Sequence, residues 1–510
     1  MSSSATNVVP ADVTGPDPAA TSVVPADVTS ASAAAQDVVR PAGAGETRTR
    51  SAAPLPAGDP AAVLRAADLV AARIAPHAAE HDRTGVFAPD NVDALWDAGL
   101  GALTLPAVLG GTGASLSTAT EAVSRVAAAD PATALVWVMH LLQLQLLGAP
   151  ETAADWDPAL RDELVADVLA GPALVNALRV EPDLGTPARG GVPATRAHRT
   201  TDAAGAVAWR VSGHKTFVTG SVGLRWLAVW AAAEDADGAP LAGPVLIRAD
   251  SPGVEIRETW DHVGLRASAS HDVLLHDVLV PGHHAVGLAA PGADSPVRRG
   301  ALAAWATGLL TAVYVGVGRS ALADLATHLR ERVPSNLGAP LSTVPRLQAE
   351  TGEVRAQLLV AETLVSDLAR DADRGGAHAD AAAERAGLVK TLATRAVVEA
   401  ARRAAGAVGN AGLTLHHPLQ RHLRDALCGP VHTPQDDTVL RQAGRTVLEA
   451  APPAAPSIPV ADRVATVDRP GSDRAAATPG SGVPRPSGGT ADTARDRAGP
   501  GTQCPRAAPS

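Results

Sequence analysis

The chain has 510 residues, 46% of them hydrophobic, so it is long enough for roughly two or three domains with sizeable cores. A net charge of −10 argues against a nucleic-acid partner bound through phosphate neutralisation. Two cysteines exclude a disulfide framework and a cysteine-rich metal site, and we expect no bound metal. Because no targeting signature precedes Arg40, the first basic residue, we expect a cytoplasmic protein.

The two ends of the chain differ in composition from the middle. Residues 1–58 and 453–510 are rich in Ala, Pro, Ser, Thr and Gly and contain almost no large apolar side chains. Such segments cannot bury enough surface to offset the entropy lost on ordering. We therefore predict two disordered tails that flank the ordered part of the chain.

The segment 59–171 has helical periodicity and is predicted to form an N-terminal helical domain. Apolar residues recur at helical spacing between Val63 and Ile74, and Asp90 is a candidate N-cap for the next helix. The glycines of Gly110–Gly113 follow no strand, so we interpret them as a tight turn between helices rather than a phosphate-binding loop.

Two uncharged runs, residues 131–150 and 300–318, approach the roughly 20 residues that a membrane span requires. The first contains His140 and two glutamines, and the second is diluted by glycine, alanine and threonine. We predict that both are helices buried inside a core and that the protein has no membrane partner.

Between residues 172 and 287 the periodicity changes to that of strands. Val207, Trp209 and Val211 alternate along the chain, as in a half-buried strand. The apolar runs Trp226–Ala231 and Val245–Ile247 indicate short buried strands separated by Gly, Pro and Asp turns. This segment is therefore predicted to be a central β-barrel-like domain.

From residue 288 to residue 452 the pattern is helical again. Two apolar stripes at helical spacing predict long packed helices: Val315, Leu322, Leu325 and Leu329, then Val354, Leu358, Ala361, Val365 and Leu368. Packed together, they indicate a C-terminal four-helix bundle. The predicted fold class is α+β, with helical, β and helical domains in that order.

Four motifs occur in order in the predicted β domain: Glu181–Thr186, Ser212–Gly220, Gly264–Ser268 and Asp277–Pro281. They are followed by a Gly-Asn loop and the sequence HPLQRHLRDA in residues 406–437. Together these motifs resemble the acyl-CoA dehydrogenase superfamily over about residues 60–450. The resemblance implies a flavin cofactor, FAD or FMN, and an oxidoreductase activity.

Residues that would hold the flavin ring follow from this resemblance. Phe217 stands where the family has a tryptophan that covers one face of the ring, so it can cover the ring but has lost the indole donor. Thr219 stands where a threonine bonds the ring, and Thr186 also lies near the flavin in the family pattern.

The diphosphate and adenine side of FAD is implied to lie elsewhere. Arg332 and Gln348 match the family's arginine and glutamine for this part, and a guanidinium suits phosphate oxygens. The loop that contains Gly409, Asn410 and Gly412 allows the backbone to approach a ligand closely. The resemblance also implies a homodimer or homotetramer, since neighbouring subunits complete the FAD site in the family.

The catalytic base is where the sequence departs from the family. Dehydrogenases carry a glutamate at the position of Thr433, and the alternative position, near Ala306, holds no glutamate either. His432 is the candidate substitute, because imidazole titrates near neutrality. Asp436 and Asp437 are rival candidates that we interpret as N-cap residues of a following helix.

Three functions stay open at this point. In the first, the protein oxidises an acyl thioester, His432 removes the proton and FAD accepts hydride, with an electron-transfer partner. In the second, it is a reduced-flavin monooxygenase that receives electrons from a flavin reductase and acts on another small molecule. In the third, it is a catalytically silent flavin-binding or acyl-binding protein.

Overall fold

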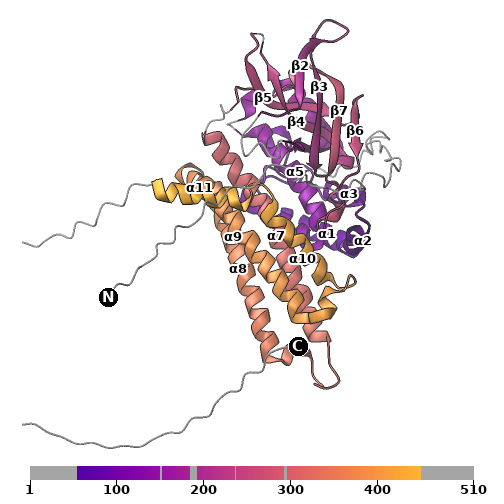
Figure 1. The fold of residues 1–510 in the computed structure, drawn as a ribbon, viewed down its shortest axis with the longest axis vertical. Helices are drawn as coiled ribbons and strands as arrows, with labels where there is room; N and C mark the ends of the chain where they lie inside the picture. Colours follow the sequence, from indigo (N-terminus) through magenta and orange to yellow (C-terminus); the bar gives the residue numbers. More distant parts are fainter. Residues whose placement is uncertain (1–53, 150–151, 184–191, 236, 292–295, 450–510) are drawn as a thin grey trace, which may run out of the picture. The chain divides into compact units, whose positions relative to one another are not determined.

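The computed structural model describes residues 54–149, 152–183, 192–235, 237–291 and 296–449 (Figure 1). Thr186 and nearly all of the two predicted tails lie outside these residues. Within them, helices precede and follow a mixed sheet, which confirms the predicted α+β fold. The connection from helices to strands falls between Ala170 and Leu174, and the return to helices falls after Pro281.

The N-terminal helices are α1 (Pro60–Ile74), α2 (Ala78–Thr84), α3 (Pro89–Asp97), α4 (Leu116–Ala129), α5 (Pro131–Gly148) and α6 (Pro158–Ala170). Asp59 caps α1 by accepting a hydrogen bond from Ala62 N. The expected N-cap Asp90 lies instead in the first turn of α3, because Pro89 occupies the first helical position. The Gly110–Gly113 segment lies between helices, as expected for a turn.

Among the residues that the structure describes, two helices are long and apolar enough to cross a membrane, α5 and residues Leu302–Glu331 of α7 (Pro296–Glu331). In each, 67% of the most apolar window is buried inside the fold. Burial of this extent is what the core helices of a folded domain show, in agreement with the expectation for the two uncharged runs.

The strands are β1 (Leu174–Leu178), β2 (Arg196–Thr201), β3 (Val207–Val218), β4 (Leu224–Glu234), β5 (Pro240–Arg248), β6 (Val254–Arg257) and β7 (His271–Pro281). They form one curled sheet in the order β1-β4-β2-β3-β7-β6, and β5 pairs with β4 from Trp226 to Glu234 (Figure 1). Strands β1 and β4 are parallel, whereas β3 and β7 are antiparallel.

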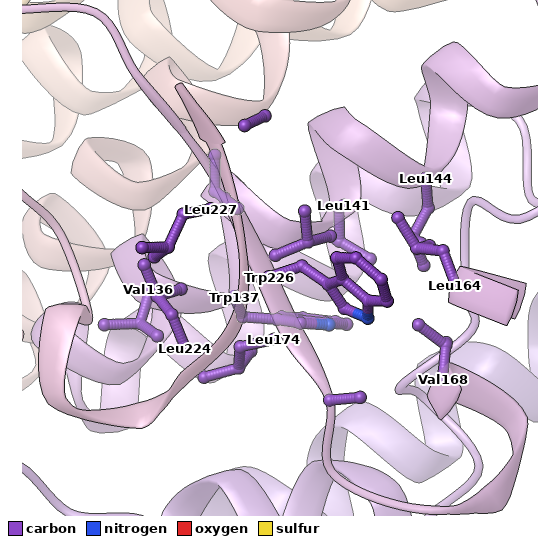
Figure 2. Close-up of a cluster of buried hydrophobic side chains, with 14 of the residues drawn as sticks. Val136, Trp137, Leu141, Leu144, Leu164, Val168, Leu174, Leu224, Trp226 and Leu227 are labelled. Carbon is purple, nitrogen blue, oxygen red and sulfur yellow. The ribbon is translucent and has the colours of Figure 1, made fainter. Parts of the chain in front are cut away.

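A continuous hydrophobic core joins α5 and α6 to this sheet. Figure 2 shows Trp137 and Leu141 of α5 next to Trp226 of β4 and Leu164 of α6. The indole N–H of Trp226 donates to Asp167 Oδ2 at 2.9 Å, so the buried ring keeps its polar group paired. This core fixes α5 against the strands that carry the flavin motifs.

The C-terminal helices are α7, α8 (Pro345–Arg374), α9 (Gly376–Val408), α10 (Pro418–Val431) and α11 (Asp436–Glu449). Helices α7 to α10 pack on one another as a four-helix bundle, and both predicted apolar stripes lie in or against its core (Figure 1). From the sequence, the prolines of the run Cys428–Pro434 predict that helical pairing ends there and that a rigid turn presents His432. This prediction is wrong in where the turn starts, since α10 continues through Pro430 to Val431. Pro430 has no N–H to donate to the carbonyl of Ala426, so α10 contains this proline with one helical hydrogen bond missing.

Candidate functional site

Phe217 lies at the end of β3 in an unusual backbone conformation. The pairing of β3 with β7 shifts register between Lys215 and Val218, and Phe217 has φ +55°. A non-glycine residue at positive φ is strained, and 63% of this side chain is exposed. Phe217 is therefore no core residue: the bulge presents an apolar ring at the surface, where a flat ligand can cover it.

The strand end is anchored by a buried ion pair. The Lys215 ammonium, which is fully buried, donates to Glu181 Oε1 and to Trp230 O, both at 2.6 Å. The same carboxylate accepts from Thr195 N at 3.0 Å. Burial lowers the pKa of Lys215, while bonds from Lys215 and Thr195 keep the pKa of Glu181 low despite its burial. The pair holds the residues just before Phe217 in place.

Thr219 lies two residues after Phe217. Its hydroxyl group belongs to a chain of hydrogen-bonded hydroxyl groups that could not be foreseen from the sequence motifs. Ser270 Oγ donates to Thr219 Oγ1 at 3.1 Å, and Ser268 Oγ lies 2.8 Å from Ser270 Oγ. Asn176 Nδ2 donates to the Thr219 carbonyl at 3.0 Å. Because Thr219 Oγ1 accepts in this chain, its own proton stays available to donate to a ligand.

Two aromatic side chains that sequence reasoning also missed lie beside Phe217. The Trp260 ring meets Phe217 edge-on at 6.3 Å between centroids, and the His262 ring stacks on Trp260 at 4.4 Å with an angle of 11°. We call Phe217, Trp260 and His262 the aromatic wall. A possible signal was the aromatic pair two and four residues before the Gly264–Ser268 motif.

His432 follows the last residue of α10 and is partly buried. Its Nδ1 shares a hydrogen bond of 2.5 Å with the hydroxyl of Tyr314, which lies fully buried in α7. Burial lowers the pKa of His432 to about 4, and the charges of Lys390 and His262 act in the same direction. His432 is thus a neutral imidazole at physiological pH. Tyr314 is the one tyrosine of the chain, a signal in the apolar run 300–318 that we did not use.

None of the carboxyl groups nearest His432 in the sequence is free to act as a base. Asp436 accepts from Lys390 Nζ at 3.3 Å and from Arg395 Nε at 2.8 Å. Asp436 and Asp437 lie in the first turn of α11 rather than at its cap. Thr433, at the position of the family glutamate, is exposed.

Asp425, in the middle of α10, ties the helix to the motif before β7. It accepts from Leu265 N at 2.7 Å, and burial raises the pKa of this carboxyl to about 7. Its neighbour Arg424 donates to Asp82 Oδ1 at 2.9 Å and to Val263 O at 2.7 Å. These bonds make α10 a rigid support for His432.

The residues predicted for the far side of FAD lie at the other end of α10. Gly409, Asn410 and Gly412 form a short 3-10 turn between α9 and α10. Arg332 follows α7 and is exposed, and Gln348 Nε2 in the first turn of α8 donates to Ser342 O at 2.9 Å. Next to this turn, a cavity of about 230 Å³ is lined by Arg346, Glu350, Arg402, Arg403, Gly406 and Ala407.

The structure therefore divides the predicted site residues into two groups. Phe217 and His432 share one region through the aromatic wall, and Thr219 adjoins it in the chain. Arg332, Gln348 and the Gly409–Gly412 turn belong to a second region, about 20 Å away by the length of a 14-residue helix. Among the described residues, no three His, Cys, Asp or Glu side chains gather as a metal site requires.

Comparison with known proteins supports the same architecture. The family model "Acyl-CoA dehydrogenase, N-terminal domain" matches residues 61–163, and "Acyl-CoA dehydrogenase, C-terminal domain" matches residues 309–436. L-evernosamine nitrososynthase from Micromonospora is 29% identical over 374 residues, which are 70% of this chain and 82% of that protein. A structure of KijD3 with FMN and a dTDP-linked amino-keto sugar has a TM-score of 0.65 and 26% identity, over 77% of this chain and 95% of that one.

A Bacillus subtilis relative named "Putative acyl-CoA dehydrogenase YdbM" is similar over most of its length. It is 33% identical over 376 residues, which are 73% of this chain and 93% of the relative. The matched C-terminal segment, residues 309–436, contains α10 and His432. The sequence motifs, the helix–sheet–helix order and these matches agree that the chain belongs to the acyl-CoA dehydrogenase family.

Proposed function

We propose that this protein is a flavin-dependent monooxygenase that uses reduced flavin and O2 to oxygenate a small-molecule substrate. The observation that supports this proposal most is the neutral His432 with its bond of 2.5 Å to Tyr314. The same burial that makes a carboxylate a stronger base makes an imidazole a weaker one, because burial raises a carboxyl pKa and lowers an imidazole pKa. His432 is therefore better suited to hold a hydrogen bond than to remove a proton beside a thioester.

The flavin ring would be held by Phe217 and Thr219. Phe217 offers an exposed apolar face, and the Thr219 hydroxyl has a proton to donate. When bound and reduced, the flavin delivers two electrons to O2, so that one oxygen atom enters the substrate and the other leaves as water. The role of His432 would be to hold or pass the proton that this water requires, and Tyr314 would fix the orientation of its ring.

A dehydrogenase is the second candidate, and the 33% identical relative named as one favours it. In that function His432 would accept the proton next to a thioester carbonyl while FAD accepts hydride. The imidazolium formed would be disfavoured by burial and by Lys390, whose buried ammonium donates to Pro430 O at 2.9 Å. This cost is the reason that we place the dehydrogenase second.

The protein partner depends on the reaction, and the choice between FAD and FMN depends on the two regions of the site. A monooxygenase needs a flavin reductase, whereas a dehydrogenase needs an electron-transfer partner. FAD would extend to Arg332, Gln348 and the turn of Gly409, Asn410 and Gly412. FMN would bind only at the first region, beside the aromatic wall. Since these distal residues are largely exposed in one chain, we propose that a second copy in a homodimer or homotetramer completes an FAD site.

The test is a pair of assays on the full-length protein. With NADH, a flavin reductase and a panel that includes a nucleotide-linked amino sugar, a monooxygenase consumes O2 in proportion to oxygenated product. Under anaerobic conditions with an acyl-CoA panel, a dehydrogenase bleaches its own flavin. Bleaching by an acyl-CoA without any oxygenated product in the first assay would overturn the first proposal, and activity in neither assay with flavin bound would favour the silent binding protein.

A further inference from the structure

A pair of histidines joins the end of α7 to the start of α10, at the opposite end of α10 from His432. His417 Nε2 lies 3.3 Å from His328 Nδ1, and the two rings meet edge-on at 5.1 Å between centroids. His328 lies in the last turn of α7, and His417 is the N-cap of α10. Both side chains are half-buried, so protons from solvent can reach them.

The hydrogen bonds around His417 fix which ring nitrogens carry protons. Leu419 N donates to His417 Nδ1 at 3.3 Å, so this ring nitrogen is an acceptor without a proton. In the neutral ring the proton then lies on Nε2, which donates to Nδ1 of His328. Both Nδ1 atoms are thus acceptors, and a proton added to either ring must break one of the two bonds.

The surroundings of the pair favour neutral rings. Burial is the largest influence, and it lowers the pKa of both His328 and His417 from the ordinary value of 6.5. The other titratable groups that act on the pair are Asp324, Glu331 and Arg332 at the end of α7 and His422 of α10. The two carboxylates favour a proton on the pair, whereas the arginine and the third histidine disfavour one.

The pair is linked by backbone bonds to both parts of the distal region. Arg332 N donates to His328 O at 3.0 Å on the α7 side. On the other side, His417 N donates to Thr414 O at 2.9 Å, directly after the turn Gly409–Leu413. A continuous set of hydrogen bonds thus connects Arg332, through the two rings, with the segment that follows this turn.

We propose that His328 and His417 form a pH-sensitive latch: while both rings are neutral they hold the segment Gly409–His417 against α7, and a proton on either ring releases it. Because the closed latch excludes protons, it is stable above the ordinary pKa of imidazole, 6.5, and opens as the pH falls below this value. The released segment contains the turn Gly409–Leu413, so acid should weaken the binding of FAD more than that of FMN. This effect on the cofactor rests on the proposed function, whereas the latch itself does not.

Histidine NMR of the full-length protein labelled with nitrogen-15 tests the two bonds. At pH 7.5 both rings should carry their proton on Nε2, and both should titrate below pH 6.5. His328→Phe and His417→Asn each remove one signal and so identify it. His416→Ala, at the exposed neighbouring histidine, is the matched control and should leave both signals unchanged. A proton on Nδ1 of either ring at pH 7.5 would overturn the latch.

Hydrogen exchange of the Leu419 amide, which His417 caps, tests the release. After correction for the intrinsic rate, this amide should exchange about fivefold faster at pH 5.5 than at pH 7.5, the effect of a lost cap. In His417→Asn it should exchange alike at both values, because asparagine caps a helix but does not titrate. In His328→Phe exchange should be fast already at pH 7.5, because the bond to α7 is gone.

His198→Ala, at an exposed histidine of β2, is the distant control and should behave like the wild-type protein. Equal acid-induced exchange in His417→Asn and the wild-type protein would overturn the latch, as would unchanged exchange in His328→Phe at pH 7.5.

A flavin titration separates the latch from the proposed function. The affinity of the wild-type protein for FAD should fall about fivefold between pH 7.5 and pH 5.5, because fewer molecules keep the closed segment. In His417→Asn it should stay constant, and the affinity for FMN should change little in either protein. Acid-dependent exchange with a constant FAD affinity would overturn the effect on the cofactor alone. A protein that binds no flavin would contradict the proposed function, and the exchange measurement would still decide the latch.

Discussion

The two ends of α10 carry the two halves of the expected cofactor site, and they are built differently. At the His432 end, side chains from α7, α9 and the β6 loop interlock with the helix, and most of their polar atoms are paired within the chain. At the other end, Gly409, Asn410 and Arg332 are exposed. A region whose groups are already oriented can bind or react with little loss of entropy, whereas an exposed region leaves a bound ligand in contact with solvent. This difference is the basis of our proposal that the chemistry belongs to one chain and that a second copy completes the far part of the site.

The largest expected effect comes from a substitution at the His432 end of α10. His432→Ala should lower turnover about 10²- to 10⁴-fold and leave flavin affinity nearly unchanged, because the imidazole acts on a proton and does not hold the ring. Stopped-flow turnover and a flavin titration measure the two quantities. Thr433→Ala, at the exposed neighbour, is the matched control and should keep wild-type turnover. If His432→Ala kept full activity, the histidine would have only a structural role.

Acid should weaken the packing of α5 against β1. His140 of α5 is fully buried, donates from Nε2 to Gly101 O at 2.8 Å and accepts from Val175 N at 3.2 Å. Burial lowers its pKa from 6.5 to about 4, so between these values the unfolded chain binds a proton that the folded chain excludes. Stability should therefore fall as pH falls through this window, by roughly 3 kcal/mol in total.

Urea denaturation at pH 7 and pH 4.5 measures this loss. His140→Gln should be less stable at pH 7 but should show a smaller loss on acidification, because the titrating group is gone. His198→Ala should keep the full pH dependence. If the free energy of unfolding fell equally between pH 7 and pH 4.5 in His140→Gln and in the wild-type protein, other groups would cause the pH dependence. His432 is the next candidate among them.

A smaller effect is expected from substitutions of Phe217, whose ring is exposed. Phe217→Ala should weaken flavin binding about tenfold, since it removes one apolar face, whereas Phe217→Trp should restore it. Fluorescence quenching of added FMN and FAD measures both. Leu279→Ala removes an exposed apolar side chain of β7 that is 44% exposed and should have no effect on binding.

The smallest effect is expected at the exposed end of α10. Arg332→Ala should weaken FAD several-fold and leave FMN unaffected, because only FAD carries the diphosphate and adenosine that would reach this residue. Arg330→Ala, at another exposed arginine of the same helix end, serves as the control. Sedimentation of the FAD-loaded protein belongs with this measurement: a flavin-loaded monomer would contradict the completion of the site by a second copy.

The helices and strands could be predicted from the sequence because the periodicity of apolar residues is a local property of each segment. The alternation from Val207 to Val211 and the stripe from Val354 to Leu368 are periodicities that depend only on which face is buried. The candidate His432 was named through the family resemblance, since it lies one residue before the position that the resemblance, counted from Arg424 and Asp425, assigns to the glutamate. The extension of α10 through Pro430 was missed because proline lacks the N–H of a helical hydrogen bond and is expected to end a helix.

The sequence by itself determined the order of the helical and β segments, the flavin motifs and the absence of a glutamate at Thr433, all of which are set by residue type and spacing. Only the tertiary structure decided what surrounds His432. Tyr314 is 118 residues away from it in the chain, and His262 is 166 residues from Cys428. Contacts over such distances leave no periodic signal, because they arise when separate elements pack and exclude water between them. The neutral state of His432 is a consequence of that packing, since imidazole in water keeps its ordinary pKa.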